Sequence, residues 1–266
     1  MFGDSNYKKH YKNGYEFLII SKGQPTQTLL CLHGMFGGLS NYDGLIEKLK
    51  DCRVIVPSLP IHEMGKKLSI ENLAHWLHDF INEFKLHRPI LVGNSLGGHL
   101  ALDYVIKYPD NVGALVLTGS SGLQEKNFGS SWPRRNDREY VRKQAGQTFY
   151  KDLVNDDLLD DIMDVITEPA KLRNILTVAR DTHEYDIEKH LPGITQQVLL
   201  IWGKNDEITP PEAARKFREK LPNARLEWID ECGHAPMMEH PETFALFLNE
   251  FLVELQNKYE DKSYRL

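Results

Sequence analysis

The stretch that decides the fold is residues 90–102, which read ILVGNSLGGHLAL. Three apolar residues, two of them β-branched, lead into Gly-Asn-Ser-Leu-Gly at residues 93–97, and a helix-like pattern follows at once. The pattern G-x-S-x-G is typical of a buried strand, a sharp turn that carries one serine, and the start of a helix. Gly93 and Gly97 lack a Cβ, so the strand and the helix can pack closely on either side of the turn.

This pattern predicts that Ser95 lifts its hydroxyl clear of a sheet, next to the unpaired N–H groups and the positive dipole end of a helix. Both features suit a site where negative charge develops. The simpler interpretation is an ordinary strand-to-helix turn that contains serine and glycine. Other parts of the chain must therefore decide between the two.

Length and composition describe an ordinary globular protein. The chain has 266 residues, 41% hydrophobic and 26% charged, with a net charge of −6. This length allows one large α/β domain or two small ones, and the acidic charge balance gives no indication of a nucleic-acid partner. The sequence contains no apolar run of the ~18 residues that a membrane span needs, and we expect no signal peptide. Cys31, Cys52 and Cys232 have no C-x-x-C spacing, so we expect a reducing, cytoplasmic location and no metal or cofactor.

Short apolar runs alternate with amphipathic stretches along most of the chain. Strands are predicted at residues 15–21, 28–32, 53–57, 90–93, 112–118, 197–202 and 224–229. Helices are predicted at residues 42–50, 70–84, 95–108, 211–220 and 243–258, with Ser69 as a capping residue for the second of them. Such alternation predicts an α/β fold with a mostly parallel twisted sheet and helices on both faces.

The segment 123–190 differs from the rest. It is rich in charged residues, has helical stretches near 138–149, 156–166 and 170–181, and lacks any buried-strand run. We therefore expect a helical insertion at 123–190 in a core domain made of residues 1–122 and 191–266.

A base and a carboxylate for Ser95 are present on loops that follow predicted strands. A serine hydroxyl is a weak nucleophile and needs a base, and the base needs a third group to orient it. His234 follows the last predicted strand, and Asp206 follows the strand before it. Glu207 and Asp230 are the competing acids, since one is adjacent to Asp206 and the other is four residues from the histidine.

The chain resembles the α/β-hydrolase family over essentially its whole length. The matching motifs are HGMFG at residues 33–37, GNSLGG at 93–98, WGKND at 202–206, and GHAP at 233–236 with Glu239 and Pro241 shortly after. Four independent motifs occur in the family's order, and Ser95, Asp206 and His234 follow the order of the family's triad.

The resemblance implies roles for several residues. Ser95 would be the nucleophile, His234 the general base and then acid, and Asp206 the orienting carboxylate. The backbone N–H groups of Met35 and Leu96 would form the oxyanion hole. His33 would tie the glycine-rich loop down by hydrogen bonds, and 123–190 would be a helical cap, inserted after the sixth core strand, that covers the pocket.

The pocket is expected to be mostly apolar, with Phe36 and Ala235 as substrate-binding residues beside Met35, Leu96 and Pro236. Further candidates are the cap residues Trp132, Arg134, Arg135, Tyr140, Tyr150 and Arg180. One departure concerns the loop after Pro57, which reads SLPIHEM at 58–64 where many relatives carry an Asp-x-x-Gly-x-Gly-type turn. In the family that loop usually fronts the pocket, so the substrates of those relatives cannot be assigned to this chain by analogy.

The resemblance favours a serine hydrolase that cleaves a small to medium, largely apolar carboxylic ester through an acyl-enzyme. A serine nucleophile speaks against dehalogenase and epoxide hydrolase chemistry, which uses an aspartate in this family. One alternative is a carbon–carbon bond hydrolase of meta-cleavage dienoates, although those relatives usually carry Trp where this chain has Ala235. Another is a slow-turnover ligand-binding protein. The expected partner is a small-molecule substrate, and the expected assembly is a monomer or homodimer.

Overall fold

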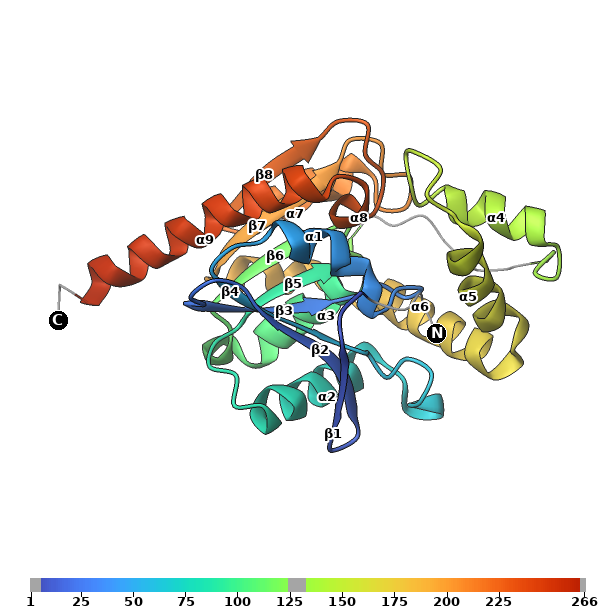
Figure 1. The fold of residues 1–266 in the computed structure, drawn as a ribbon, viewed down its shortest axis with the longest axis horizontal. Coiled ribbons are helices and arrows are strands. Elements are labelled where there is room, and N and C mark those ends of the chain that lie inside the picture. The colour runs from blue at the N-terminus through green and yellow to red at the C-terminus, as the bar shows by residue number, and fades with distance from the viewer. Residues whose placement is uncertain (1–5, 124–132, 264–266) are drawn as a thin grey trace.

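An eight-stranded sheet forms the centre of the computed structural model, which describes residues 6–123 and 133–263 (Figure 1). Its strands are β1 (Lys9–Lys12), β2 (Tyr15–Ser21), β3 (Gln27–Leu32), β4 (Cys52–Pro57), β5 (Ile90–Asn94), β6 (Ala114–Thr118), β7 (Gln197–Gly203) and β8 (Ala224–Ile229). They lie in the order β1-β2-β4-β3-β5-β6-β7-β8. The β1–β2 and β2–β4 pairs are antiparallel and all others are parallel, so the predicted fold class is confirmed.

The helices are α1 (Asp43–Lys48), α2 (Ile70–Glu83), α3 (Leu96–Lys107), α4 (Arg138–Gly146), α5 (Asp156–Thr167), α6 (Pro169–Glu184), α7 (Pro211–Lys220), α8 (Pro236–Glu239) and α9 (Pro241–Ser263). Ser69 caps α2 as predicted, because its Oγ accepts the N–H of Asn72 at 3.1 Å. Among the residues that the structure describes, no helix is both long and apolar enough to cross a membrane.

Strand β1 was not predicted. Its sequence, KHYK, is polar and lies at the edge of the sheet, where it pairs only with β2. An edge strand that is half solvated needs no apolar alternation, so periodicity in the sequence could not reveal it. Pairing with β2, which brings His10 opposite Phe17, makes this segment a strand.

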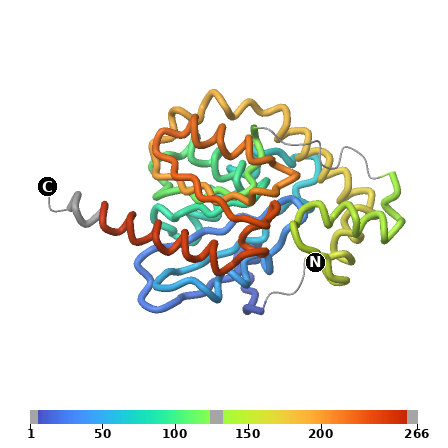
Figure 2. Tube along the Cα trace, turned by 90° about the horizontal axis from the view of Figure 1, so that it is seen from above, coloured from blue at the N-terminus to red at the C-terminus, as the bar shows by residue number. Residues whose placement is uncertain are grey.

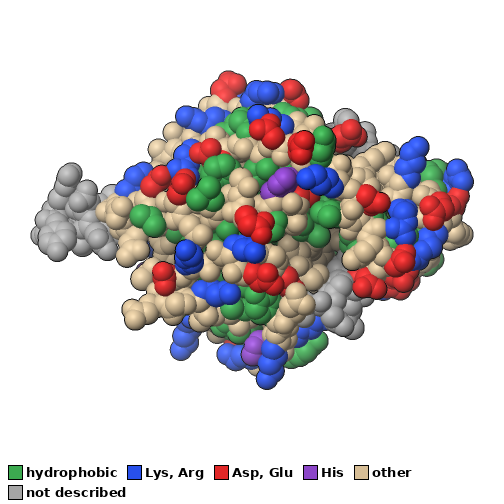
Figure 3. Space-filling view, turned by 45° about the horizontal axis from the view of Figure 1, so that its top comes forward, with side chains coloured by type: hydrophobic (Ala, Val, Ile, Leu, Met, Phe, Trp, Pro, Cys, Tyr) green, Lys and Arg blue, Asp and Glu red, His purple; other side chains and the backbone are tan. Residues whose placement is uncertain are grey.

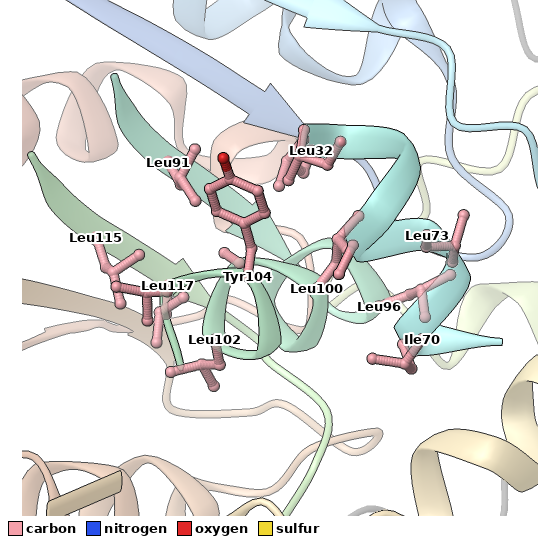
Figure 4. Packing of buried hydrophobic residues seen from close by; sticks show 14 of the residues in the cluster. Leu32, Ile70, Leu73, Leu91, Leu96, Leu100, Leu102, Tyr104, Leu115 and Leu117 are labelled. Atoms are coloured by element: carbon pink, nitrogen blue, oxygen red, sulfur yellow. The ribbon is translucent and has the colours of Figure 1, made fainter. Parts of the chain in front are cut away.

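Two apolar clusters cover the two faces of the sheet. In β5, Leu91 packs in a cluster with α2, α3 and α7, whereas Ile90 and Val92 pack in a cluster with α1 and α9. Figure 4 shows part of the first cluster, in which leucines of β5 and β6 lie next to side chains of α3. Cys31 and Cys232 are fully buried in the second cluster, where they pack among apolar side chains. Both faces of the central strands are therefore covered, as the continuous apolar runs predicted.

The glycines around the serine turn permit an unusually close approach of backbones. A Cβ on Gly97 would lie 2.1 Å from the carbonyl oxygen of Leu32, and one on Gly93 would lie 2.4 Å from that of Gly97. Both distances are far below van der Waals contact. Strand β3, strand β5 and helix α3 can meet at this point only because both residues are glycine.

The segment 123–190, called the cap segment below, contains α4, α5 and α6 between β6 and β7. Part of it has a small apolar cluster of its own, formed by Val141, Ala145, Val154, Leu159, Ile162 and Ile166. By contrast, α6 contributes Ile175 and Val178 to the main cluster of the sheet. Figures 1 and 2 place the cap helices at one end of the molecule and the C-terminal end of α9 at the other.

Candidate active site

Ser95 occupies the turn between β5 and α3 in a conformation that few residues adopt. Its φ of 54° and ψ of −118° lie outside the regions favoured by L-residues. The turn is held because the Ser95 N–H donates to Thr118 O at 3.1 Å and Ser95 O accepts from the N–H of Ser121 at 3.2 Å. Leu96 is the first residue of α3, so its N–H has no acceptor within the helix. The strained turn therefore presents one hydroxyl beside a helix N-terminus.

Asp206 and His234 form the carboxylate–imidazole pair that their positions in the sequence predicted. Asp206 Oδ2 lies 2.9 Å from His234 Nδ1, and the two residues are 3% and 6% exposed. The competing acids lie elsewhere: Glu207 is exposed, and Asp230 is exposed and pairs with Lys204 at 2.7 Å. The structure thus brings together one of the three candidate carboxylates and the histidine.

A third residue, Thr209, contacts both members of this pair, and the sequence patterns did not predict its part in the site. Its hydroxyl donates to Asp206 Oδ2 at 2.9 Å and lies 3.2 Å from His234 Nδ1. The other oxygen, Asp206 Oδ1, accepts the N–H groups of Ile208 and Thr209 at 2.8 and 2.9 Å. Trp202 Nε1 in turn donates to the Thr209 carbonyl at 2.8 Å. The carboxylate is therefore locked in the orientation that faces the imidazole.

Asn94 and Gly119 place the loop between β8 and α8, which carries His234 and is called the histidine loop below, against the serine turn. Asn94, which directly precedes Ser95, donates from Nδ2 to His234 O at 3.0 Å and to Thr118 O at 3.2 Å. Gly119 has a φ of 52°, and a Cβ there would lie 2.7 Å from His234 Nδ1. The imidazole therefore rests on a position that only glycine can occupy. A glycine immediately after a buried strand was the available signal for this contact.

His33 holds the glycine-rich loop that follows β3. Leu59 N–H donates to His33 Nε2 at 3.0 Å, so the proton sits on Nδ1, which donates to Gly34 O at 2.8 Å. Gly37 N–H also donates to Gly34 O, at 3.0 Å. In a trans peptide the N–H points opposite to the C=O, so these two bonds direct the N–H of Met35 away from His33. Burial lowers the pKa of His33 to about 4, which keeps the ring neutral.

The unusual loop at 58–64 connects this arrangement to the cap segment. Leu59 binds His33 from one side. From the other side, Asn174 of α6 donates from Nδ2 to Ile61 O at 3.2 Å and to His62 O at 3.1 Å. A loop that departs from the family pattern is therefore pinned between the glycine-rich loop and α6.

The substrate-binding candidates have different surroundings. Phe36 is half-buried and packs against both the main cluster and the cap cluster. Ala235 is 3% exposed and packs in the cluster under α9. Of the cap candidates, Arg134, Arg135, Tyr150 and Arg180 are exposed, Tyr140 packs on the cap cluster, and Trp132 lies outside the described residues.

The comparison with protein families agrees with this geometry. The model of the alpha/beta hydrolase family matches residues 29–245. The chain belongs to this family. As a member it is a hydrolase, with ester bonds and carbon–carbon bonds both among the targets of its relatives.

Among curated relatives, monoacylglycerol lipase ABHD6 of Bos taurus is 25% identical, covering 96% of this chain and 84% of its own length. The 2-hydroxy-6-oxo-6-phenylhexa-2,4-dienoate hydrolase of Comamonas testosteroni is 27% identical, covering 89% and 92%. Among solved structures, MGS-MChE2, an alpha/beta hydrolase enzyme from the metagenome of lagoon sediments of Mar Chica, Morocco, is 35% identical with a TM-score of 0.75, covering 93% and 98%.

Proposed function

We propose that this protein is a serine hydrolase that cleaves small to medium, largely apolar carboxylic esters through an acyl-enzyme. The observation that carries the proposal is the 2.9 Å contact between Asp206 Oδ2 and His234 Nδ1, buried beside the strained turn of Ser95. A carboxylate that holds Nδ1–H leaves Nε2 of the same ring free to act as a base.

In the proposed reaction His234 Nε2 takes the proton of Ser95 Oγ as that oxygen attacks the ester carbonyl. The resulting imidazolium is stabilised by Asp206 and then protonates the leaving alcohol. Water, deprotonated by the same histidine, attacks the carbonyl of the acyl-enzyme. The bond to Ser95 Oγ then breaks, the imidazolium returns its proton to that oxygen, and the carboxylic acid is released. Each proton thus passes through one ring nitrogen in both half-reactions.

The oxyanion of each tetrahedral intermediate would bind to the backbone N–H groups of Met35 and Leu96. Gly34 lies against the nucleophile, because a Cβ on it would be 3.3 Å from the Cβ of Ser95. Met35 directly follows Gly34, so its N–H belongs to the backbone next to Ser95, where the oxyanion would form. Losing one donor of this kind typically costs about 10²–10³-fold in rate. Phe36 follows Met35 and would contact the acyl or alcohol part of the substrate.

Replacing Ser95 by alanine tests the proposal directly. We expect Ser95→Ala to lower turnover of p-nitrophenyl acetate and butyrate by more than about 10³-fold, while circular dichroism and the melting temperature show an intact fold. A fluorophosphonate probe should label the wild type and not the variant. Ser69→Ala, which removes a serine from the start of α2, should keep both activity and labelling.

Full esterase activity in Ser95→Ala would disprove the assigned nucleophile. A wild type that neither reacts with the probe nor cleaves any ester would favour the ligand-binding alternative. The second enzymatic candidate is carbon–carbon hydrolysis of a dienoate, favoured by the similarity to the Comamonas testosteroni enzyme. Loss of the visible absorbance of a dienoate ring-fission product, faster than ester cleavage, would establish that candidate instead.

A further inference from the structure

The carboxylate of Glu239 lies between the histidine loop and the cap segment. Glu239 is the last residue of α8. Its Oε1 accepts the N–H of Gly233 at 2.9 Å, and its Oε2 accepts the N–H of Tyr150 at 2.7 Å. Gly233 immediately precedes His234, whereas Tyr150 lies between α4 and α5. One side chain therefore holds backbone groups of both regions.

The same two regions also touch directly. The N–H of His234 donates to the carbonyl oxygen of Thr148 at 2.8 Å. A Cβ on Gly233 would lie 2.7 Å from Thr148 O and 2.9 Å from Tyr150 N, so the backbones are in contact and only glycine fits. The segment 148–150 therefore forms one wall of the loop that carries the histidine.

A glutamate suits this position for a chemical reason. An ionised carboxylate offers two acceptor oxygens and no donor, and its hydrogen bonds to N–H groups are stronger than those of a neutral acceptor. A glutamine has a single acceptor oxygen, and its NH₂ group would face one of the two N–H groups. An aspartate is one methylene shorter. The length and the charge of the glutamate side chain together allow it to accept both N–H groups at once.

We propose that Glu239 is a positioning residue through which the docked cap segment fixes the imidazole of His234. The inference rests on the proposed function, since it assigns the histidine a catalytic role. With both N–H groups bound, the histidine loop is confined between Glu239 and Thr148, and Nε2 stays at one distance from Ser95. Loosening either bond lets the loop shift, which affects every step that moves a proton through this ring.

The first test compares Glu239→Gln with Glu242→Gln. Glu242 is exposed and pairs with Lys48 at 3.0 Å, so its variant is a control for loss of a nearby charge. With a p-nitrophenyl ester we expect Glu239→Gln to lower kcat by about 10–100-fold, as displacements near 1 Å do, with KM within about threefold. Fluorophosphonate labelling of Ser95 should slow in parallel. The control should match the wild type in all three readouts.

The second test removes the N–H on the cap side only. Tyr150→Pro lacks this N–H, whereas Tyr150→Ala keeps it and loses the same exposed side chain. We expect kcat to be lower in the proline variant than in the alanine variant. Combined with Glu239→Gln, the proline change should lower kcat less than it does in the wild type, because both changes weaken the same link between Glu239 and the cap segment. If Glu239→Gln does not fold, the comparison of Tyr150→Pro with Tyr150→Ala tests the proposal by itself.

A folded Glu239→Gln with wild-type kcat and labelling would overturn the inference, as would a lower melting temperature with unchanged kcat. Equal kcat in Tyr150→Pro and Tyr150→Ala would also overturn it. The proposed function fails separately, through full activity in Ser95→Ala. An enzyme that depends on Ser95 but is indifferent to Glu239 would retain its triad and lose only this role for the cap segment.

Discussion

The carboxyl edge of the sheet and the cap helices α4 and α5 are stabilised by different kinds of contact. At the sheet edge, backbones approach so closely that a Cβ on Gly203 would lie 2.1 Å from the carbonyl oxygen of Gly233. In the cap, exposed ion pairs join the two helices, as between Arg142 and Asp156 at 2.6 Å. Figure 3 shows side chains of both charges gathered over the cap end of the molecule.

Backbones pack closely where the candidate site is assembled. At the sheet edge, three segments distant in the chain carry Ser95, Asp206 and His234, and close backbone contacts and hydrogen bonds hold these segments in place. The outer cap helices carry no such demand, so solvent-screened pairs and a small cluster suffice. The cap segment contacts the surroundings of the candidate site through Thr148, Tyr150 and Asn174.

The largest effect should come from adding one methyl group at the sheet edge. Gly97→Ala would force a Cβ against the backbone of Leu32, and we expect it to destabilise the fold by more than about 3 kcal/mol. Gly146→Ala is the matched change in the cap, at the end of α4 where nothing lies within 4 Å of a new Cβ. It should be neutral or stabilise by up to about 1 kcal/mol. Urea denaturation measures both.

Equal stability of the two alanine variants would mean that the sheet edge can relax as freely as the cap helices, and would contradict this difference between the two regions. A soluble, wild-type-like Gly97→Ala would also remove the reason given for the close approach of β3 and α3.

A second prediction concerns His99, which lies on α3 one turn after Ser95. It is fully buried, and among the described residues neither ring nitrogen has a hydrogen-bond partner. Burial lowers the pKa of His99 to about 4, as it does for His33. Replacing a buried, unsatisfied polar group by an apolar one of similar size removes a cost of about 1–3 kcal/mol. His99→Leu should therefore raise the melting temperature at pH 7.

The pH dependence has a definite sign. In the unfolded chain a histidine has a pKa near 6.5, so it binds a proton below that pH. In the folded core His99 stays neutral until the pH approaches 4, so the unfolded state binds more protons between these two values. Stability from the neutral rings is complete above about pH 6.5 and falls as the pH drops toward 4. We expect His99→Leu to lose less stability than the wild type between pH 7 and 5. His183→Gln, an exposed change on α6, should follow the wild type.

An acid-induced loss of stability that is the same in His99→Leu and in the wild type would contradict this account of the core. Melting temperatures across that pH range, at constant ionic strength, give the comparison.

The smallest effect is expected from an ion pair of the cap. Hydrogen bonds from Arg138 and Arg142 lower the pKa of Asp156, whose side chain is 76% exposed. Pairs so exposed contribute little to stability and are screened by salt. Asp156→Asn should lower the melting temperature only slightly in dilute buffer, and the difference from the wild type should vanish in 1 M NaCl. A shift that persists at high salt would show that the cap depends on this pair more than its exposure indicates.

Much of the fold could be predicted because the relevant signals are local. The continuous apolar runs of the central strands, the glycines around Ser95 and the proline at the start of α7 each reflect a requirement of the residue's own backbone or of its immediate neighbours. Strand β1 escaped prediction because a polar edge segment becomes a strand only through its partner. The capping of α2 was predicted at Ser69. The side chain of Asn72 donates to Lys67 O at 2.6 Å, and this contact depends on the conformation of the preceding loop, which the sequence pattern does not specify.

In the candidate site the sequence alone pointed to Ser95, Asp206 and His234, because strand ends, loop positions and chain order restrict which groups can meet at one sheet edge. Tertiary structure decided what holds them: Thr209 on the carboxylate, Gly119 under the imidazole, and Glu239 between the histidine loop and the cap. The physical reason is the same throughout. Backbone conformation and burial leave a local pattern in the sequence, whereas a hydrogen bond between residues 89 positions apart leaves none until the chain has folded.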